Sequence, residues 1–213
     1  MTNFIPIFPL GIVVYPGEKL NLHIFEPCYK QLIIECHARS KPFGIPTVLK
    51  NGITEFGTLA QITKIVEIYE DGKMDISIEG LKVFKILEIV KSIPDKLFSG
   101  AIVTYPHNEE KKHSRLMKKV VDAIHELYSL LKVTKDFKKT DEDLTSYDIA
   151  HHTGLSLDEE YELLELMKEG QRLIYLQIHL LKTIPIVAGT ESLKKKIQLN
   201  GHFKELKGFN FDL

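Results

Sequence analysis

The stretch that most constrains the fold of this chain is residues 56–80, FGTLAQITKIVEIYEDGKMDISIEG. A long β-rich run ends there at Asp71-Gly72, and apolar and polar residues then alternate over residues 74–79, MDISIE. An Asp-Gly pair between two such runs is among the strongest short-range signals for a β-hairpin, because both residues tolerate the backbone angles of a tight turn. The sequence therefore predicts two long antiparallel strands joined at residues 71–72.

Further short β-rich runs, separated by proline and glycine, fill the rest of the first half. These runs are FIPIF, IVVYP, LNLHIF, LKVFKILEIV and SGAIVTYP. In LNLHIF, the leucines and the isoleucine fall on one face of the predicted strand, whereas Asn21, His23 and Phe25 fall on the other. One helix interrupts this region, at PCYKQLIIECHARS, where apolar residues recur at helical spacing.

The second half of the chain has the pattern of a helical bundle. Apolar residues between positions 115 and 133 form a broad helical stripe. The segments TSYD (residues 145–148) and SLDE (residues 156–159) have the spacing of capping boxes, so each predicts the start of a helix. Gly154 is expected to end the first of these two helices.

The C-terminal region is expected to contain two separate helices. The first covers residues 169–183 and ends before Pro185, since proline removes a hydrogen bond from a helix interior. The second is short and stops at Asn200-Gly201, and the three phenylalanines that follow are expected to dock the last residues onto the protein. The predicted organisation is a β domain over residues 1–107 and a helical bundle with a C-terminal extension over residues 108–213.

The charges of the chain are balanced, with 28 Lys and Arg against 29 Asp and Glu. This balance provides no strong positive field for a nucleic-acid backbone, so nucleic acid is not expected as a partner. The first ten residues, MTNFIPIFPL, lack the basic and apolar regions of a signal peptide, and no run approaches the about 18 apolar residues of a membrane span. We therefore expect a cytoplasmic protein with no membrane partner, in keeping with two reduced cysteines.

The motifs of common enzymes do not occur in the sequence. It has no phosphate loop ending in Gly-Lys-Ser/Thr, no G-x-G-x-x-G and no G-x-S-x-G. His151 and His152 are adjacent, so they point about 100° apart on a helix and cannot chelate one metal ion as a pair. Cys28 and Cys36 would lie about 12 Å apart on one helix, beyond the about 7 Å that a disulfide allows. We predict no catalytic residue, no metal ligand and no cofactor.

Glu26 and Pro27 stand where the strand LNLHIF gives way to the predicted helix. Proline suits the first position of a helix, and a carboxylate beside a helix N-terminus meets the positive end of the helix dipole. A single carboxylate with no identified partner is weak evidence for acid–base catalysis. We therefore interpret Glu26 first as an architectural residue at this corner.

Three stretches together resemble a known family. They are IPIFPLGIVVYPGEKLNLHIFEPCYKQLI, FGTLAQITKIVEIYEDGKMDISIEGLKVFKI and DIAHHTGLSLDEEYELLELMKEGQRLIYLQIHLL. The Ile-Phe-Glu-Pro corner and the Phe-Gly-Thr before the long strand make them similar to the N-terminal, substrate-recognition domain of Lon proteases, over roughly residues 4–185. The small stand-alone Lon-domain proteins of bacteria are more similar still. The resemblance implies an α+β fold: a PUA-like β pseudo-barrel with one helix, followed by an α-helical bundle.

The resemblance also implies a function in binding. In full Lon proteases this region recognises substrates and helps assembly, while a separate ATPase motor and a Ser-Lys peptidase domain carry out proteolysis. Neither is expected in these 213 residues, so the resemblance supports a non-enzymatic, polypeptide-binding module that acts as an adaptor or regulator of proteolysis. Its expected partners are unfolded or degron-like polypeptide segments, with a protease or another protein as a second partner.

A peptide site is expected in the cleft between the β domain and the bundle, because clefts at domain junctions are the usual binding sites. Each candidate residue could instead be an ordinary core or corner residue. The candidates come from the matched strand, the adjoining helix and neighbouring strands: His23, Phe25, Glu26, Tyr29, Phe8 and Tyr15.

Two other functions stay open on this sequence. PUA-like barrels elsewhere bind RNA, and a steep loss of affinity with salt would identify that activity. The other alternative is a small hydrolase with an unrecognised site. It would require degradation of peptides by the pure chain, abolished by a single side-chain change.

Overall fold

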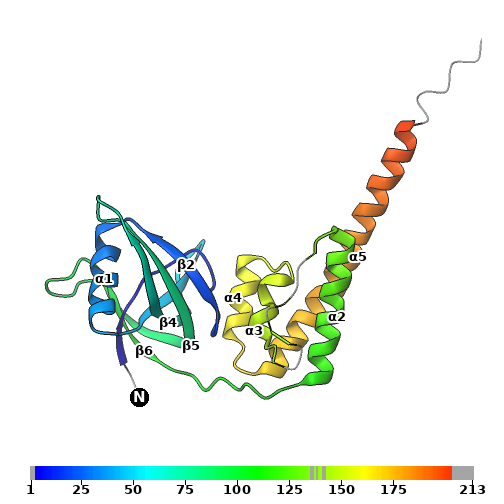
Figure 1. Cartoon of the computed structure of the whole chain (residues 1–213). Helices are drawn as coiled ribbons and strands as arrows, with labels where there is room; N and C mark the ends of the chain where they lie inside the picture. Colours follow the sequence, from blue (N-terminus) through cyan, green and yellow to red (C-terminus); the bar gives the residue numbers. More distant parts are fainter. Residues whose placement is uncertain (1–2, 135–136, 138, 141–142, 203–213) are drawn as a thin grey trace, which may run out of the picture.

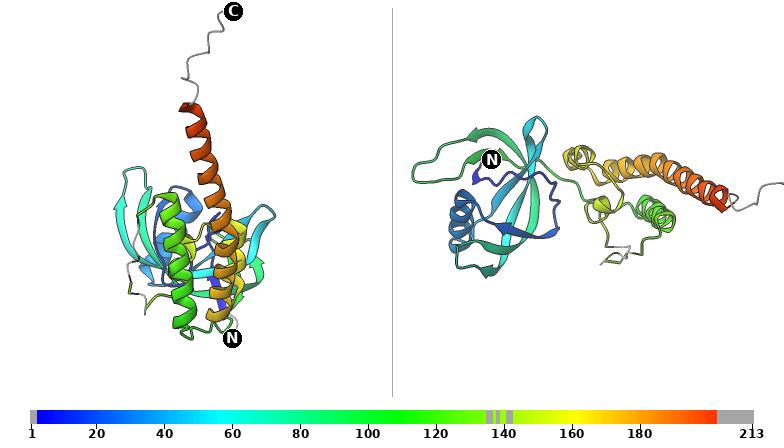
Figure 2. Two further views of the ribbon diagram at one scale, coloured as in Figure 1. Left: turned by 90° about the vertical axis from the view of Figure 1, so that its right-hand side faces the viewer. Right: turned by 90° about the horizontal axis from the view of Figure 1, so that it is seen from above.

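A computed structural model of the chain describes residues 3–134, 137, 139–140 and 143–202, with side chains described up to Ser192. It consists of an antiparallel sheet with one helix, followed by a group of helices, and the two parts lie side by side (Figures 1 and 2). The predicted α+β fold class is therefore confirmed. The predicted boundary between residues 107 and 108 falls in the linker between these parts, and the division of the chain into two domains stays a prediction.

Six strands form one sheet in the order β1-β6-β5-β4-β3, with β2 paired to β5. β5 has a different partner along each half of one edge, because its first part pairs with β2 and its second part with β6. This shared strand lets the sheet curl around a core (Figure 1). The strands are β1 (Asn3–Pro6), β2 (Lys19–Ile24), β3 (Phe43–Leu49), β4 (Gly52–Ile68), β5 (Met74–Val90) and β6 (Gly100–Thr104).

Two strand predictions were wrong. IVVYP lies outside the strands, because this segment is held by side-chain contacts: the Thr58 hydroxyl donates to the Val14 carbonyl, and Tyr15 is fully buried. LKVFKILEIV is the second part of β5 rather than a separate strand. Gly80 permits this continuation, since a Cβ there would lie 2.3 Å from the Tyr15 carbonyl oxygen.

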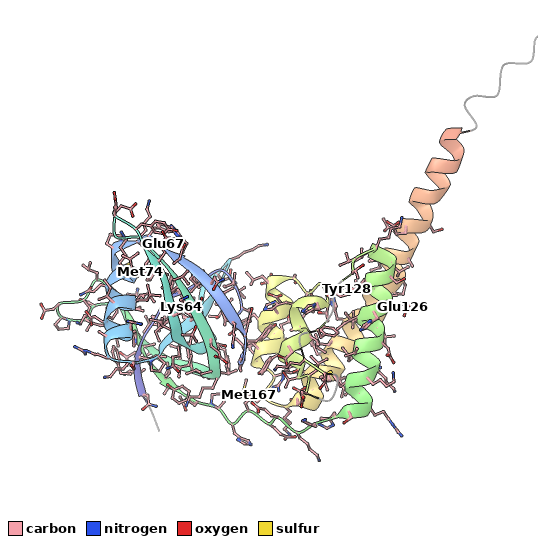
Figure 3. All side chains as sticks on the ribbon, in the orientation of Figure 1. Lys64, Glu67, Met74, Glu126, Tyr128 and Met167 are labelled. Atoms are coloured by element: carbon pink, nitrogen blue, oxygen red, sulfur yellow. The ribbon has the colours of Figure 1, made fainter. Side chains whose placement is uncertain are left out.

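The hairpin between β4 and β5 is confirmed. The Tyr69 N–H donates to the Lys73 carbonyl and the Gly72 N–H to the Tyr69 carbonyl, each at 2.8 Å. Gly72 has a φ of +75°, a backbone conformation that residues with a Cβ rarely adopt. Ile68 pairs with Met74 directly beside this turn. Figure 3 labels Met74 on β5 together with Lys64 and Glu67 on the neighbouring β4.

Helix α1 (Pro27–Ala38) follows β2 and covers one side of the sheet (Figure 1). Its Leu32, Ile33 and Cys36 are buried in the core of the β part. Glu26 is the N-cap residue, with extended backbone angles, and its side chain makes no capping hydrogen bond. Its carbonyl accepts the Lys30 N–H at 2.9 Å, and its carboxylate accepts the Cys28 thiol at 3.9 Å beside the positive end of the helix dipole.

The helical part begins with α2 (Ser114–Leu131), whose buried residues form the predicted stripe. Both predicted capping boxes are confirmed, at the starts of α3 (Ser146–Ile149) and α4 (Leu157–Glu165). A short 3-10 helix, η1 (Ala150–His152), follows α3, and Gly154 ends this segment with a φ of +76°.

Helix α5 (Glu169–His202) corrects the prediction of two separate C-terminal helices, because it continues through Pro185 for 34 residues. Pro185 cannot donate to the carbonyl of Leu181. The Leu181 side chain is 65% exposed, so water can reach this side of the helix and solvate that carbonyl. The tail that was expected to dock, residues 203–213, lies outside the described residues.

Over Glu169–Ser192, α5 has the length and the mean hydropathy, 1.3, of a helix that could cross a membrane. This helix corrects the expectation that no segment approaches the length and apolar character of a membrane span. This is weak evidence for a membrane span, since the core helices of soluble proteins pass the same test. Leu173, Leu176 and Leu180 on this segment are fully buried in the core of the helical part.

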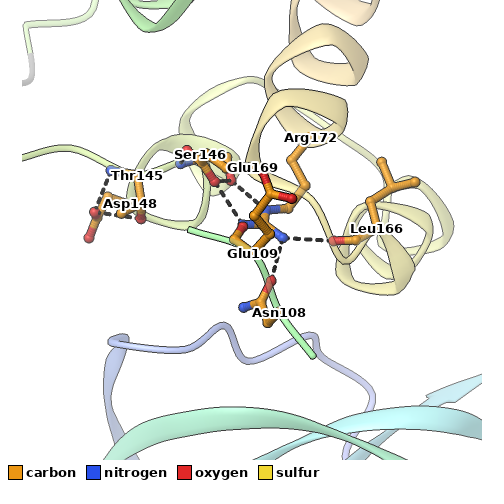
Figure 4. Close-up of polar contacts among 8 residues, drawn as sticks. All are labelled: Asn108, Glu109, Thr145, Ser146, Asp148, Leu166, Glu169 and Arg172. Atoms are coloured by element: carbon orange, nitrogen blue, oxygen red, sulfur yellow. Dashed lines mark hydrogen bonds and ion pairs between the residues drawn. The ribbon is translucent and has the colours of Figure 1, made fainter. Parts of the chain in front are cut away.

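A buried arginine ties the helical part together (Figure 4). Arg172 on α5 has 0% exposure and lies 2.8 Å from the Glu169 carboxylate. Its guanidinium also donates to the Ser146 hydroxyl and to the Asn108 side chain, each at 2.7 Å, and lies over the Tyr147 ring. A buried charge is tolerated only with such partners, so Arg172 fixes the linker, α3 and α5 against one another.

The β part and the helical part share one apolar core. Val13, Tyr15 and Val83 of the β part are buried in the same cluster as the buried residues of α2–α5. The Tyr15 ring stacks on Tyr147 with centroids 5.2 Å apart, and its hydroxyl donates to the Glu160 carbonyl at 2.9 Å. The two parts are therefore packed together rather than joined only by the linker.

Candidate functional site

The six residues that were predicted to bind peptide do not come together in one cleft. Tyr15 is at the junction of the two parts, but it is fully buried. Phe8 and Tyr29 pack on each other in the core of the β part, with ring centroids 4.1 Å apart. The other predicted residues, His23, Phe25 and Glu26, are exposed at the end of β2 and the start of α1.

A groove does lie at the junction, with a volume of about 520 Å³. We call it the junction groove. Its β-part wall is residues 16–19, and its helical wall comes from the region of α3 and η1 and the segment before it. The lining residues of the helical wall are Phe137, Lys139, Leu144, Tyr147, Asp148, His151 and His152.

The β-part wall is shaped by a tight turn at Pro16-Gly17. Gly17 has a φ of +81°, and its N–H donates to the Gly80 carbonyl at 2.8 Å. The Glu18 carboxylate accepts the Tyr15 N–H at 2.9 Å, which holds it at the rim of the groove. The turn therefore presents a fixed carboxylate to the helical part.

His151 bridges the two parts across this groove. One ring nitrogen lies 2.7 Å from the Glu160 carboxylate on α4, and the other lies 3.3 Å from the Glu18 carboxylate. Burial alone would lower the pKa of His151, but hydrogen bonds to Glu160 and Glu18 outweigh it and raise this pKa to about 9. His151 is therefore a cation at neutral pH, held between two carboxylates.

The rest of the groove combines polar and aromatic groups. Lys139 forms an ion pair with Asp148 at 2.7 Å. The Phe137 ring packs edge-on against His152, with centroids 5.0 Å apart. Such a surface offers hydrogen-bonding partners and apolar contacts to a ligand of mixed polarity, such as a peptide.

A second exposed surface lies at the other end of β2, near the hairpin turn. The His23 ring lies 6.2 Å from Phe25 and 5.9 Å from Tyr69, between ring centroids. Asp75 bonds both His23, at 2.6 Å, and the Tyr69 hydroxyl, at 2.7 Å. The hydrogen bond to Asp75 raises the pKa of Tyr69 to about 12. The hydrogen bonds with His23 and Tyr69 lower the pKa of Asp75. We call His23, Phe25, Tyr69 and Asp75 the hairpin patch.

Neither metal nor thiol chemistry is indicated within the part of the chain that the structure describes. No group of three or more His, Cys, Asp and Glu residues there could hold a metal ion. Cys28 and Cys36 are both free and lie on α1, as predicted. Burial raises the pKa of Cys36 to about 11, which makes its thiol a poor nucleophile.

Sequence reasoning missed Glu18, Glu160 and Tyr69, which complete these two surfaces. Glu18 and Glu160 come together only through the His151 ring, which contacts both carboxylates, and Glu18 and His151 are far apart in the chain. Tyr69 carried a usable signal, since it lies two residues before the predicted Asp71-Gly72 turn.

Comparison with protein families supplies the biological context of these surfaces. Residues 5–182 match the model of the ATP-dependent protease La (LON) substrate-binding domain. A curated relative, the Lon protease of Geobacter metallireducens, is 25% identical over 197 aligned positions, covering 84% of this chain. The chain spans about a quarter of that protease, since the match covers 24% of it.

Two solved structures share the fold. One is a Lon N-terminal domain protein from Xanthomonas campestris, with a TM-score of 0.64, 20% identity, and coverage of 82% of this chain and 96% of that chain. The other is the N-terminal domain of Mycobacterium avium complex Lon protease, with a TM-score of 0.62, 16% identity, and coverage of 84% and 98%.

Proposed function

Because the chain belongs to the family of LON substrate-binding domains, we propose that it is a non-enzymatic module that binds unfolded or degron-like segments of polypeptide. The match over residues 5–182 carries this proposal. That range includes all of the residues that line the junction groove and all of the hairpin patch. Both surfaces expose aromatic rings beside hydrogen-bonding groups, which suits peptide side chains and backbone together.

We further propose that the module serves proteolysis in the cytoplasm as an adaptor or regulator, with a protease as its second partner. The support is the relationship to a Lon protease, in which the similar region forms one part of a much longer chain. The match spans both the β part and the helical part. The proposal therefore assigns recognition to the assembled chain, not to the sheet alone.

Fluorescence anisotropy tests the proposed function directly. A labelled panel of peptides from unfolded proteins and a set of short RNAs are titrated with the pure chain at two salt concentrations. Saturable binding of peptides that changes little with salt is the expected result. Binding of RNA alone, falling steeply with salt, would move RNA recognition into first place. No saturable binding of any peptide would overturn the proposal.

One aromatic side chain of the hairpin patch provides a matched pair of variants. Phe25 is 57% exposed on this patch, whereas Phe4 on β1 is 53% exposed and belongs to neither surface. Phe25→Ala is expected to weaken peptide binding about tenfold, or about 1.4 kcal/mol, because exposed aromatic anchors dominate such contacts. Phe4→Ala is expected to leave affinity within about twofold. Equal affinities of the two variants would remove the hairpin patch from the site.

A further inference from the structure

The outer edge of β2 is open along its length. β2 pairs with β5 through six consecutive residue pairs, from Lys19 with Glu79 to Ile24 with Met74. Among the residues that the structure describes, β5 is the only strand that pairs with β2. An open edge is a row of unpaired backbone groups that can accept another strand.

The backbone groups on this edge follow from the ladder. The Gly80 N–H donates to the Glu18 carbonyl at 2.9 Å, and the Gly80 carbonyl accepts the Gly17 N–H at 2.8 Å. Both backbone groups of Gly80 therefore face the start of β2, which sets the alternation of the ladder. Because bonded and non-bonded pairs alternate in an antiparallel ladder, the backbone N–H and C=O groups of Lys19, Asn21 and His23 point away from β5. No described residue forms a hydrogen bond with these groups.

The opposite strand supports this alternation. Ser77 pairs with Asn21, and its carbonyl accepts the hydroxyl of Thr63 on β4 at 3.0 Å. The Ser77 carbonyl therefore faces β4 rather than β2, as expected for a non-bonded pair. The Asn21 and Ser77 side chains bond each other at 2.7 Å on the exposed face.

Another edge of the same sheet differs from β2. The end of β4 beyond its pairing with β3, residues 61–68, carries register shifts between Ile62 and Lys64 and between Ile65 and Glu67. Bulges of this kind twist an edge and obstruct regular pairing with a further strand. β2 has no register shift in its ladder, so its edge is the better template.

The open edge also connects the two exposed surfaces. Lys19, at the start of β2, lines the junction groove, and His23, near its end, belongs to the hairpin patch. A strand rises about 3.3 Å per residue, so about five residues of an extended peptide would span the distance between them. Leu20 and Leu22 are only half-buried, which leaves apolar surface beside alternate positions of such a peptide.

We propose that an extended polypeptide segment adds to the sheet as a strand along β2. It bonds the outward N–H and C=O groups of Lys19, Asn21 and His23, and it runs between the junction groove and the hairpin patch. The preferred segment alternates apolar and polar residues, with its apolar side chains on the side of Leu20 and Leu22. This mode rests on the proposed function and specifies how the polypeptide is held, largely through main-chain bonds that tolerate many sequences.

A proline substitution in β2 tests whether a bound peptide forms hydrogen bonds with the outward backbone groups of this strand. Asn21→Pro removes an outward N–H and places a ring on the open edge, without removing a bond to β5. Asn21→Ala is the matched control, since it also loses the bond to Ser77 but keeps the N–H. The probe is a fluorescein-labelled ten-residue peptide of alternating valine and serine or lysine. We expect at least a tenfold loss of affinity for Asn21→Pro and a change within about twofold for Asn21→Ala, with circular dichroism verifying that both variants fold.

The peptide provides an independent test that needs no protein variant. Two versions of the probe are N-methylated, one at the valines and one at the intervening residues. A peptide paired as a strand loses binding with one pattern and retains it with the other, because only alternate N–H groups face β2. Equal effects of both patterns, with Asn21→Pro unchanged, would overturn strand addition while leaving peptide binding intact. If the wild-type chain binds no peptide, the proposed function itself fails, and with it this inference. Sedimentation of the wild-type chain as a dimer that Asn21→Pro dissociates would assign the edge to a second copy instead.

Discussion

Two buried or half-buried cations hold the molecule together at the scale of single residues. Arg172 joins the linker, α3 and α5 inside the helical part, and His151 joins the helical part to the β part. The two differ in what pH can do to them. An arginine stays charged at any pH at which proteins fold, whereas histidine loses its charge within the experimental range.

His151 is expected to make stability depend on pH. Its pKa in the folded chain, about 9, exceeds its ordinary value of 6.5, so its contribution is complete below pH 6.5 and is lost as pH rises through 9. Urea unfolding at pH 6, 7.5 and 9.5 measures this. Between the lowest and the highest pH, the free energy of unfolding of the wild type should fall by up to about 1 kcal/mol more than that of His151→Gln. The value is modest because the ion pairs are partly exposed.

The matched control for this pH series is His37→Gln. His37 is exposed on α1 and lies outside the junction groove. The free energy of unfolding of His37→Gln should differ from that of the wild type by the same amount at all three pH values. Parallel curves for His151→Gln as well would show that the bridge contributes nothing to stability.

The sequence correctly predicted which face of a strand a side chain occupies, but it did not predict which residues that side chain contacts. Alternation placed Asn21, His23 and Phe25 on one face of the predicted strand, and all three side chains are exposed, although β2 itself ends at Ile24. It could not place Asp75 beside His23, because that contact depends on the register between strands that are 52 residues apart in the chain. Phe8 and Tyr15 were interpreted as strand residues of a cleft, whereas long-range packing buries both.

At the scale of elements, α5 extends farther than any local rule suggests. It has 34 residues, or about 50 Å at 1.5 Å per residue, and it continues past the end of α2 (Figure 1). Strong local signals, such as the Asp71-Gly72 turn and both capping boxes, predicted their elements correctly. The proline rule failed at Pro185 because packing of Ile184 and Val187 against the helical core favours a continuous helix.

Replacing this proline should stabilise the protein. Pro185→Ala restores an N–H donor to the Leu181 carbonyl and is expected to raise the free energy of unfolding by up to about 3 kcal/mol. Urea unfolding followed by circular dichroism measures the change. Gly189→Ala, at an open position in the same helix, is the control, since it changes helix propensity by about 1 kcal/mol without restoring a bond. A gain no larger than that of the control would mean that Pro185 costs the helix nothing.

At the scale of the whole molecule, the two parts are coupled by a common core. The fold class and the succession of a β part and a helical part followed from the sequence, since they depend on periodicity within short windows. The exact elements did not, because β3 was not predicted and β5 and α5 are each longer than expected. The junction groove did not, because both of its walls depend on how the two parts pack. The burial of Val13, Tyr15 and Val83 against the helices is the feature that fixes this packing.

This coupling predicts that the β part is unstable alone. A fragment of residues 1–107 would expose Val13, Tyr15 and Val83, and each buried apolar side chain contributes about 1.5–3 kcal/mol. The fragment should therefore unfold at a lower urea concentration than the full chain, as measured by circular dichroism. Substituting all three exposed residues with serine should improve its solubility. A fragment as stable as the full chain would instead show that the shared core contributes nothing to the stability of the β part.

The shared strand β5 also has a mechanical consequence. A polypeptide drawn lengthwise along β2 would load the hydrogen bonds between β2 and β5 in shear, so that several must break together rather than one after another. β5 passes the load to β4 through the ladder on its opposite edge, and to β6 farther along the edge that β2 occupies. A sheet built around one long central strand therefore resists traction along its strands better than it resists peeling from its edge.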